Sequence, residues 1–282
     1  MSKTVVFIHG GWVTPACWDP FVSYFEARGY RCLAPAWPGK DRPVEEIRAD
    51  PSPLAGLGID SIVDHYAGVI RELEEPPILV GHSFGGLFVQ LLIDRGLGAA
   101  GIAIDSAPPK GIFAFAPTTL LSLGRILAIP FGWRKVVHWS YPEYRFAFVH
   151  TMAPDEQRRI WDEQIVPDSG RPFFEAGYSF LDRRSPARVD FAKPDRAPLL
   201  FISGEADRAM APSTVRRMYR AHRASPARTD FLSFPGRTHW IIAQEGWEEV
   251  AGSCEDWIDS LGQAGGDPLH DHVEGEFELL VQ

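Results

Sequence analysis

The sequence contains no asparagine, few lysines and only three cysteines. Without asparagine the chain offers no acceptor for N-glycosylation. Cys17, Cys32 and Cys254 lie far apart and form no C-x-x-C pair, so we expect reduced structural thiols instead of a disulfide framework. The N-terminus leads directly into an apolar strand pattern and does not resemble a secretory signal. Together these absences favour a cytoplasmic location.

Long apolar runs and an excess of basic residues are also missing. No segment reaches the ~18 consecutive apolar residues of a membrane-spanning helix. The net charge of −9 argues against nucleic acid and against an anionic membrane surface as partners. The chain has no internal repeat, P-loop or G-x-G-x-x-G fingerprint, and we expect no cofactor. Its 282 residues, 45% of them hydrophobic, are typical of a globular protein with a sizeable core.

Short apolar runs alternate along the chain with helical patterns. The candidate strands are Thr4–Ile8, Arg31–Pro35, Pro77–Gly81, Gly101–Asp105, Pro198–Ser203 and Thr229–Phe234. The candidate helices are Trp18–Gly29, Ile59–Leu73, Phe84–Arg95, Ser213–His222 and Trp247–Leu261. Nearly continuous apolar strands that alternate with helices predict an α/β fold with a mostly parallel sheet of about six strands, covered by helices on both faces.

The alternation is interrupted once, between Asp105 and Pro198, where the chain is rich in aromatic residues. We interpret residues 107–197 as a helical cap inserted into a core formed by residues 1–106 and 198–261. Most of the aromatic residues are expected to form the core of the cap itself, and a few to line a pocket beneath it.

Residues 262–282 form a glycine-rich link and an acidic tail. The tail contains His270, His272 and Glu274, which could bind a metal, but short polar tails contain such clusters by chance. We therefore expect a disordered or docking arm and predict no metal site.

The segment Gly81–Gly85 reads Gly-His-Ser-Phe-Gly and lies between an apolar strand pattern and a helical pattern. In this context a G-x-S-x-G sequence predicts a nucleophile elbow, a sharp turn that exposes Ser83 above the sheet. Its glycines allow the strand and the helix to approach closely. A serine hydroxyl is a weak nucleophile, so the motif also requires a base and an acid that orients the base.

His239 is the expected base because it lies in a turn-rich loop directly after the last candidate strand. The expected acid is Asp207, in the loop after the preceding strand; Asp105 is the second candidate and Glu205 the third. We predict structural or surface roles for the remaining core and cap histidines, with His222 in solvent on its helix. These are His9, His65, His82, His138, His150 and His222.

The tetrahedral intermediate of acyl transfer needs two backbone N–H donors. We expect one from Phe84, the residue after the nucleophile, and one from the loop after the first strand. In that loop Gly11 is the preferred donor, with Trp12 as the alternative. Trp12 and Trp240 are the expected substrate-binding residues, and His9 is expected to fix the loop.

These motifs occur in the order Ser, acid, His, and the chain resembles the α/β-hydrolase superfamily. The resemblance covers nearly all of the chain up to about Leu261 and implies a three-layer fold whose first two usual strands are absent. The start of the chain, from Phe7 to Trp12, is also similar to the plant methylesterase and hydroxynitrile lyase branch. The cap is longer and more aromatic than that branch would suggest.

We predict a serine hydrolase that acts on a small, largely apolar carboxylic ester or lactone. The same triad supports other reactions, such as hydroxynitrile cleavage, perhydrolysis and C–C bond hydrolysis, and the lyase would be expected to offer a cap lysine, Lys110 or Lys135. A small-molecule receptor on this fold is a further alternative. Exposed aromatics of the cap, or the tail segment Phe277–Val281, could form the contact of a homodimer.

Overall fold

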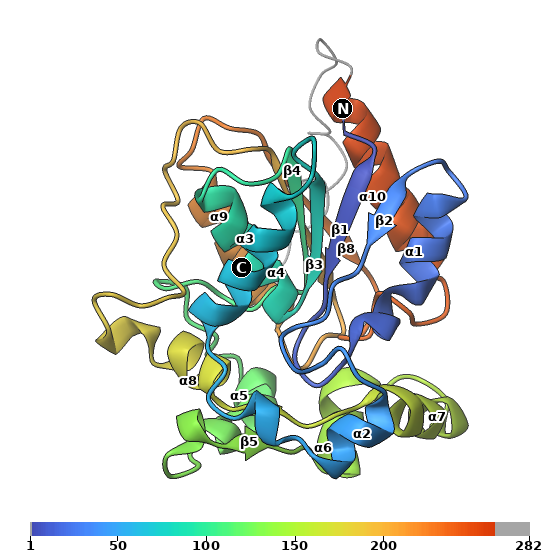
Figure 1. Ribbon diagram of the computed structural model, residues 1–282, viewed down its shortest axis with the longest axis vertical. Coiled ribbons are helices and arrows are strands. Elements are labelled where there is room, and N and C mark those ends of the chain that lie inside the picture. The colour runs from blue at the N-terminus through green and yellow to red at the C-terminus, as the bar shows by residue number, and fades with distance from the viewer. Residues whose placement is uncertain (1, 263–282) are drawn as a thin grey trace, which may run out of the picture.

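A parallel β-sheet forms the centre of the molecule, as the sequence predicts. The structure is a computed structural model and describes residues 2–262 (Figure 1). Its six strands lie in the order β2-β1-β3-β4-β7-β8, and all neighbouring pairs are parallel. They are β1 (Thr4–Ile8), β2 (Arg31–Leu33), β3 (Ile78–His82), β4 (Ala100–Ile104), β7 (Leu199–Gly204) and β8 (Thr229–Phe234). The central strands β3, β4 and β7 are buried at every residue, which explains their continuous apolar sequences.

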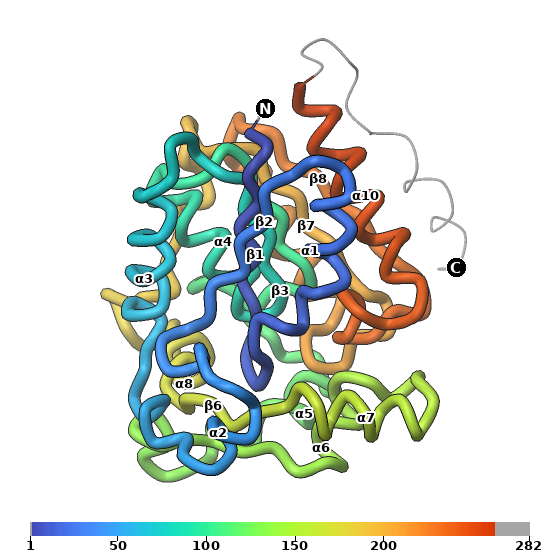
Figure 2. Tube along the Cα trace, turned by 45° about the vertical axis from the view of Figure 1, so that its right-hand side comes forward, coloured from blue at the N-terminus to red at the C-terminus, as the bar shows by residue number. Residues whose placement is uncertain are grey.

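Helices cover both faces of this sheet (Figures 1 and 2). One face carries α1 (Asp19–Glu26) and α10 (Trp247–Gly262), and the other carries α3 (Ile59–Arg71), α4 (Phe84–Asp94) and α9 (Pro212–His222). The central helix α4 is buried over ten of its 11 residues, whereas α3 buries residues three and four apart and leaves the others exposed or half-buried. Even α10, the longest of the described helices at 16 residues, is too short and polar to cross a membrane, and the same holds for the others.

The segment between β4 and β7, here called the insert, lies below the carboxyl ends of the strands (Figure 1). Besides four helices it contains a small antiparallel sheet that no strand pattern in the sequence predicts. Its elements are α5 (Pro117–Leu127), β5 (Val136–Val137), α6 (Tyr141–Phe148), α7 (Pro154–Gln164), β6 (Asp168–Ser169) and α8 (Arg171–Gly177). Short 3₁₀ turns occur in the insert and in the core, at Pro15–Trp18, Ser52–Leu54, Gly132–Arg134 and Ser179–Leu181.

A short helix of the core, α2 (Val44–Ala49), joins the layer of the insert and was also missed. Its Arg48 guanidinium donates hydrogen bonds to the carbonyl oxygens of Trp161, Asp162 and Ile165, at 2.6, 2.8 and 2.9 Å. These carbonyls lie at the carboxyl end of α7, where most carbonyls lack a partner within the helix and carry the negative end of its dipole. One side chain of the core therefore caps a helix of the insert.

The predicted boundaries of the core elements agree with the structure to within a few residues, and those of β1 and β8 agree fully. The largest change is at the carboxyl end of α1, which ends at Glu26 where the sequence predicts Gly29, and Trp18 at its start belongs to a 3₁₀ turn. The predicted tail, with His270, His272 and Glu274, lies outside the described residues.

The prediction of a solvated His222 was wrong. Its side chain is buried between Phe191 and Phe201, and its Nε2 atom lies 3.0 Å from Gln90 Oε1. Burial lowers the pKa of His222 to about 3, so the imidazole is neutral and Nε2–H donates this bond. The signal was present in the sequence, because Thr214, Met218 and His222 follow one another at helical spacing on the buried face of α9.

We expect His222→Gln to weaken the pH dependence of stability. In the unfolded chain a histidine has a pKa of about 6.5, so below that pH the unfolded state binds a proton that the folded state excludes. Stability is therefore lost as the pH falls, by about 1 kcal/mol between pH 7.5 and 5.5 for this residue. Urea denaturation at both pH values should show a loss that is smaller by this amount in the variant, and equal losses in the two proteins would contradict the prediction.

Candidate active site

Ser83 lies on a strained turn between β3 and α4. Its backbone has φ 57° and ψ −119°, a conformation that residues other than glycine rarely adopt. The backbone is packed so closely around this turn that two neighbouring positions have no room for a side chain. A Cβ on Gly81 would lie 2.2 Å from Gly85 O, and one on Gly85 would lie 1.9 Å from Ile8 O. The two motif glycines therefore allow backbone to touch backbone, and the turn presents Ser83 at the carboxyl edge of the sheet.

His239 and Asp207 form a buried hydrogen-bonded pair at the same edge. His239 follows β8 and Asp207 follows β7, and His239 Nδ1 lies 2.6 Å from Asp207 Oδ2. The other oxygen of Asp207 accepts hydrogen bonds from the backbone N–H groups of Ala209 and Met210, at 2.7 and 2.8 Å. This arrangement fixes the carboxylate and leaves Nε2 of His239 as the ring atom that can accept a proton. Burial lowers the pKa of His239, so the ring is neutral and able to act as a base.

The two other candidate acids make different contacts. Asp105 is fully buried beside Asp207, and its Oδ1 accepts the Gly204 N–H at 2.8 Å. Burial, and then the charge of Asp207, raise the pKa of Asp105 well above its usual value. Since Asp207 accepts three hydrogen bonds and Asp105 only this one among the described contacts, the charge of the pair belongs on Asp207. Glu205 points to the surface, where its carboxylate accepts a bond from Ser233.

His82 is packed behind His239 and donates through Nε2 to the backbone oxygen of His239, at 2.7 Å. His82, Asp105 and His239 place one nitrogen or oxygen each within 4.8 Å of one another, a spacing that a metal ion could bridge. The ring atoms Nε2 of His82 and Nδ1 of His239 already form hydrogen bonds with protein atoms. We therefore interpret the cluster as a hydrogen-bonded support for His239.

The loop after β1 runs beside Ser83. A Cβ on Gly10 would lie 2.8 Å from Ser83 Cβ, so this glycine allows the loop to touch the elbow. Trp12 has φ 62°, and its N–H donates to Asp168 Oδ2 at 2.7 Å, so it is not available for a bound substrate. Of the two loop donors considered from the sequence, Gly11 therefore remains. The second expected donor, Phe84, is the first residue of α4, where N–H groups lack partners within the helix.

The ring of His9 is part of the support of this loop. It is buried and stacked on Trp37, whose N–H lies 3.2 Å from His9 Nε2 and whose indole N–H donates to His9 O at 3.1 Å. His9 Nδ1 lies 2.8 Å from Gly10 O, and the two contacts fit a neutral ring protonated on Nδ1. Burial, with the nearby Lys40, lowers the pKa of His9 and favours this neutral form.

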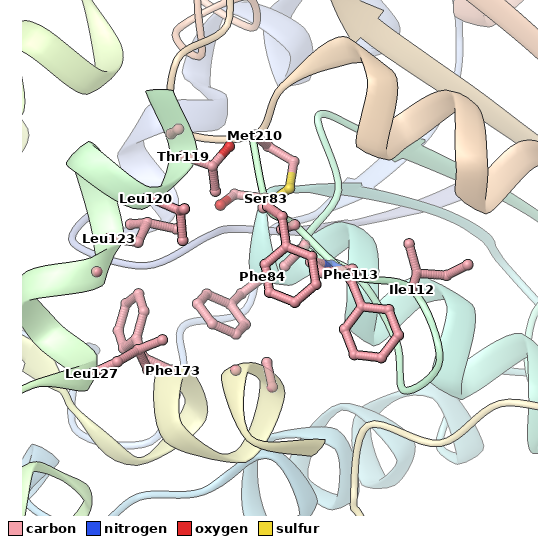
Figure 3. Close-up of a pocket in the computed structure, with 18 of the residues that line it drawn as sticks. Ser83, Phe84, Ile112, Phe113, Thr119, Leu120, Leu123, Leu127, Phe173 and Met210 are labelled. Carbon is pink, nitrogen blue, oxygen red and sulfur yellow. The ribbon is translucent and has the colours of Figure 1, made fainter. Parts of the chain in front are cut away.

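A cavity of about 140 Å³ lies between the core and the insert and contains Ser83 and His239 in its wall (Figure 3). Ser83, His239, Phe84 and Trp12 line it from the core, together with Met210. The wall contributed by the insert is almost entirely apolar, and Figure 3 shows several of its side chains around Ser83. It includes Ile112, Phe113, Phe115, Leu120, Leu123, Leu127, Phe148, Phe173 and Phe180. None of the described residues that line the cavity carries a full charge at neutral pH.

Aromatic residues at the cavity are partly exposed. Phe113 lines it but is 42% exposed, and its ring lies 5.2 Å from that of Phe115 and 5.9 Å from that of Phe180. The three rings belong to segments of the insert before α5 and after α8. Such rings suit an apolar molecule that moves from water into the cavity.

Trp240, expected to bind substrate, is buried and does not line the cavity. Its indole packs near Phe148, and it is Phe148 that faces the cavity and lies against His239, with ring centroids 4.4 Å apart. Neither candidate lysine of the cap lines the cavity either, and Lys110 donates to the backbone of Asp182. No signal in the sequence distinguishes Phe148 from the many other aromatic residues of the insert.

Comparisons of sequence identify a family. The sequence model of the alpha/beta hydrolase family matches residues 5–253. A pyrethroid hydrolase from Sphingobium wenxiniae is 32% identical over 88 residues, which are 31% of this chain and 29% of that protein. The matched region thus spans less than a third of that relative.

Solved structures share the fold over nearly the whole chain. A monoacylglycerol lipase from Paleococcus ferrophilus is 21% identical with a TM-score of 0.64, covering 91% of this chain and 94% of that one. A methylesterase from Arabidopsis is 16% identical with the same TM-score and covers 91% and 99% of the two chains. At these identities the comparison shows the fold, and it confirms the resemblance to plant methylesterases at that level.

We expect Gly85→Ala to destabilise the protein severely, because its methyl group would overlap Ile8 O. The cost should be about 3 kcal/mol or more in the free energy of unfolding. Gly68→Ala in α3 is the matched control, since a Cβ there meets no atom within 4 Å. It should stabilise the helix by about 0.5–1 kcal/mol. Urea denaturation of both variants tests the pair, and a similar effect of the two substitutions would contradict the close contact.

Proposed function

Because the chain belongs to the alpha/beta hydrolase family, we propose that it is a serine hydrolase that cleaves small, neutral and largely apolar carboxylic esters or lactones. One observation carries the proposal. Ser83 and His239 line one apolar cavity, and His239 is hydrogen-bonded to the buried Asp207. The similar proteins include a pyrethroid hydrolase, a lipase and a methylesterase, and this supports a reaction at an ester bond.

In the proposed reaction His239 Nε2 takes the proton of Ser83 as its oxygen attacks the ester carbonyl. The charge that develops on the carbonyl oxygen is stabilised by the N–H groups of Gly11 and Phe84. Asp207 holds the Nδ1–H tautomer of His239 and stabilises the imidazolium. His239 then gives the proton to the leaving alcohol, and a water activated by the same histidine releases the acid from Ser83.

The cavity supports a neutral, apolar substrate. A charged group that enters it would lose its hydration and find no fully charged partner among the described lining residues, which is unfavourable by several kcal/mol. Apolar acyl or alcohol groups would instead pack against the aliphatic and aromatic side chains of the insert.

We expect the purified protein to hydrolyse p-nitrophenyl butyrate and Ser83→Ala to lower kcat by about 10⁵-fold. The reason is that the substitution removes the hydroxyl that would form the acyl-enzyme. Ser253→Ala, at a half-buried serine of α10 whose hydroxyl donates to Glu249 O of the same helix, is the matched control and should keep the activity of the natural chain. Equal turnover by Ser83→Ala and the natural chain would refute the proposal, as would a failure of a fluorophosphonate probe to label Ser83.

The same assay tests the substrate class. p-Nitrophenyl hemisuccinate carries a carboxylate on an acyl chain of similar length, and its kcat/KM should be lower by about 100-fold or more. Comparable values for the two esters would show that the apolar wall does not select the substrate.

The identity of the acid is tested by paired substitutions. Asp207→Asn should lower kcat by about 10⁴-fold, because an amide neither enforces the tautomer of His239 nor stabilises its positive charge. Asp105→Asn should lower it by less than about tenfold, since the amide oxygen can still accept the Gly204 N–H. Steady-state kinetics on p-nitrophenyl butyrate measure both, and a larger loss for Asp105→Asn would reverse the assignment.

A further inference from the structure

A fully buried ion pair lies beside the loop that follows β1. Lys40 Nζ and Asp168 Oδ2 are 2.6 Å apart, and both side chains are shielded from solvent. Lys40 belongs to the core, whereas Asp168 belongs to β6 of the insert. Ion pairs of this kind add little net stability, because the cost of removing both charges from water offsets their attraction. The contacts of the pair indicate a different role.

Residues of the insert bind both the N–H and the carbonyl oxygen of Trp12. Asp168 Oδ2 accepts the Trp12 N–H at 2.7 Å, and the N–H of Val166 donates to Trp12 O at 2.8 Å. Asp168 is itself fixed, because its other oxygen accepts the Ser169 N–H at 2.7 Å. Trp12 has a left-handed backbone, with φ 62°, which is unfavourable for a tryptophan and needs such support.

The carboxylate is also close to Gly11, the proposed oxyanion donor. A Cβ on Gly11 would lie 3.5 Å from Asp168 Oδ2. A bare negative charge at this place would oppose the negative charge of the tetrahedral intermediate. Lys40 neutralises it, and its ammonium also donates to Val13 O at 3.1 Å, on the far side of Trp12.

We propose that Lys40 and Asp168 are positioning residues that hold the loop His9–Trp12 in the form that binds the oxyanion. Asp168 takes up the Trp12 N–H and thereby sets the direction of the preceding Gly11 N–H, while Lys40 cancels the charge of Asp168. The inference rests on the proposed function. It also means that the insert, which supplies Asp168 and Val166, completes the oxyanion site in addition to covering the cavity.

Two double variants separate the hydrogen bond from the charges. Lys40→Met with Asp168→Asn removes both charges but keeps an oxygen for the Trp12 N–H. Lys40→Met with Asp168→Leu removes the charges and the acceptor with a side chain of similar size. The first should retain kcat to within about tenfold, and the second should lose about 100-fold or more with KM changed less than about threefold. If the leucine variant does not fold, Asp168→Ala combined with Lys40→Met makes the same comparison.

Hydrogen–deuterium exchange of the peptide that covers residues 9–13 gives a readout that needs no activity. Exchange should be faster in the leucine variant than in the asparagine variant. Ile258→Ala, at a buried position of α10, controls for general destabilisation and should leave kcat and this exchange unchanged.

Equal kcat and equal exchange in the two double variants would overturn the inference. If the natural chain does not hydrolyse the ester, or if Ser83→Ala hydrolyses it equally fast, the proposed function is overturned instead. The exchange comparison would then still decide whether Asp168 fixes the loop.

Discussion

The site depends on direct contact between two stretches of backbone. The loop after β1 and the turn that carries Ser83 approach so closely that Gly10 and Gly85 have no room for a Cβ. This contact brings the nucleophile next to the N–H groups that would stabilise the oxyanion. It also forces Ser83 and Trp12 into left-handed conformations, which the surrounding sheet and insert must hold in place. The rigid parallel sheet supplies that support, since β1 and β3 are neighbours and both are buried.

The polar groups in and around the site are buried in hydrogen-bonded pairs. Asp207 is paired with His239, His82 with the backbone of His239, and Lys40 with Asp168. Removing any of these groups from water is costly unless a partner replaces the lost hydrogen bonds. The pairing therefore fixes the position of each side chain more sharply than apolar packing alone would. A catalytic centre benefits from this fixation because its groups need not reorganise during the reaction.

Local patterns predicted the sheet, the elbow and the placement of His239 and Asp207 on neighbouring strand ends. They succeeded because the strands and the loops that follow them correspond to short apolar runs and glycine-rich turns. The contact between Lys40 and Asp168 joins residues 128 positions apart, and no local pattern of charge announces it. The same holds for Phe148, which faces the cavity while Trp240 does not. His222 is different, because the helical spacing of its buried neighbours carried the information that its charged neighbours obscured.

The uncharged lining of the cavity has a consequence for the end of the proposed reaction. Hydrolysis turns a neutral ester into a carboxylic acid that is ionised at neutral pH, so the substrate matches the cavity and the product does not. The described walls offer no cation to retain the new carboxylate. Under the proposed chemistry, the environment that draws the ester in would expel the acid, and product inhibition by the acid would be weak.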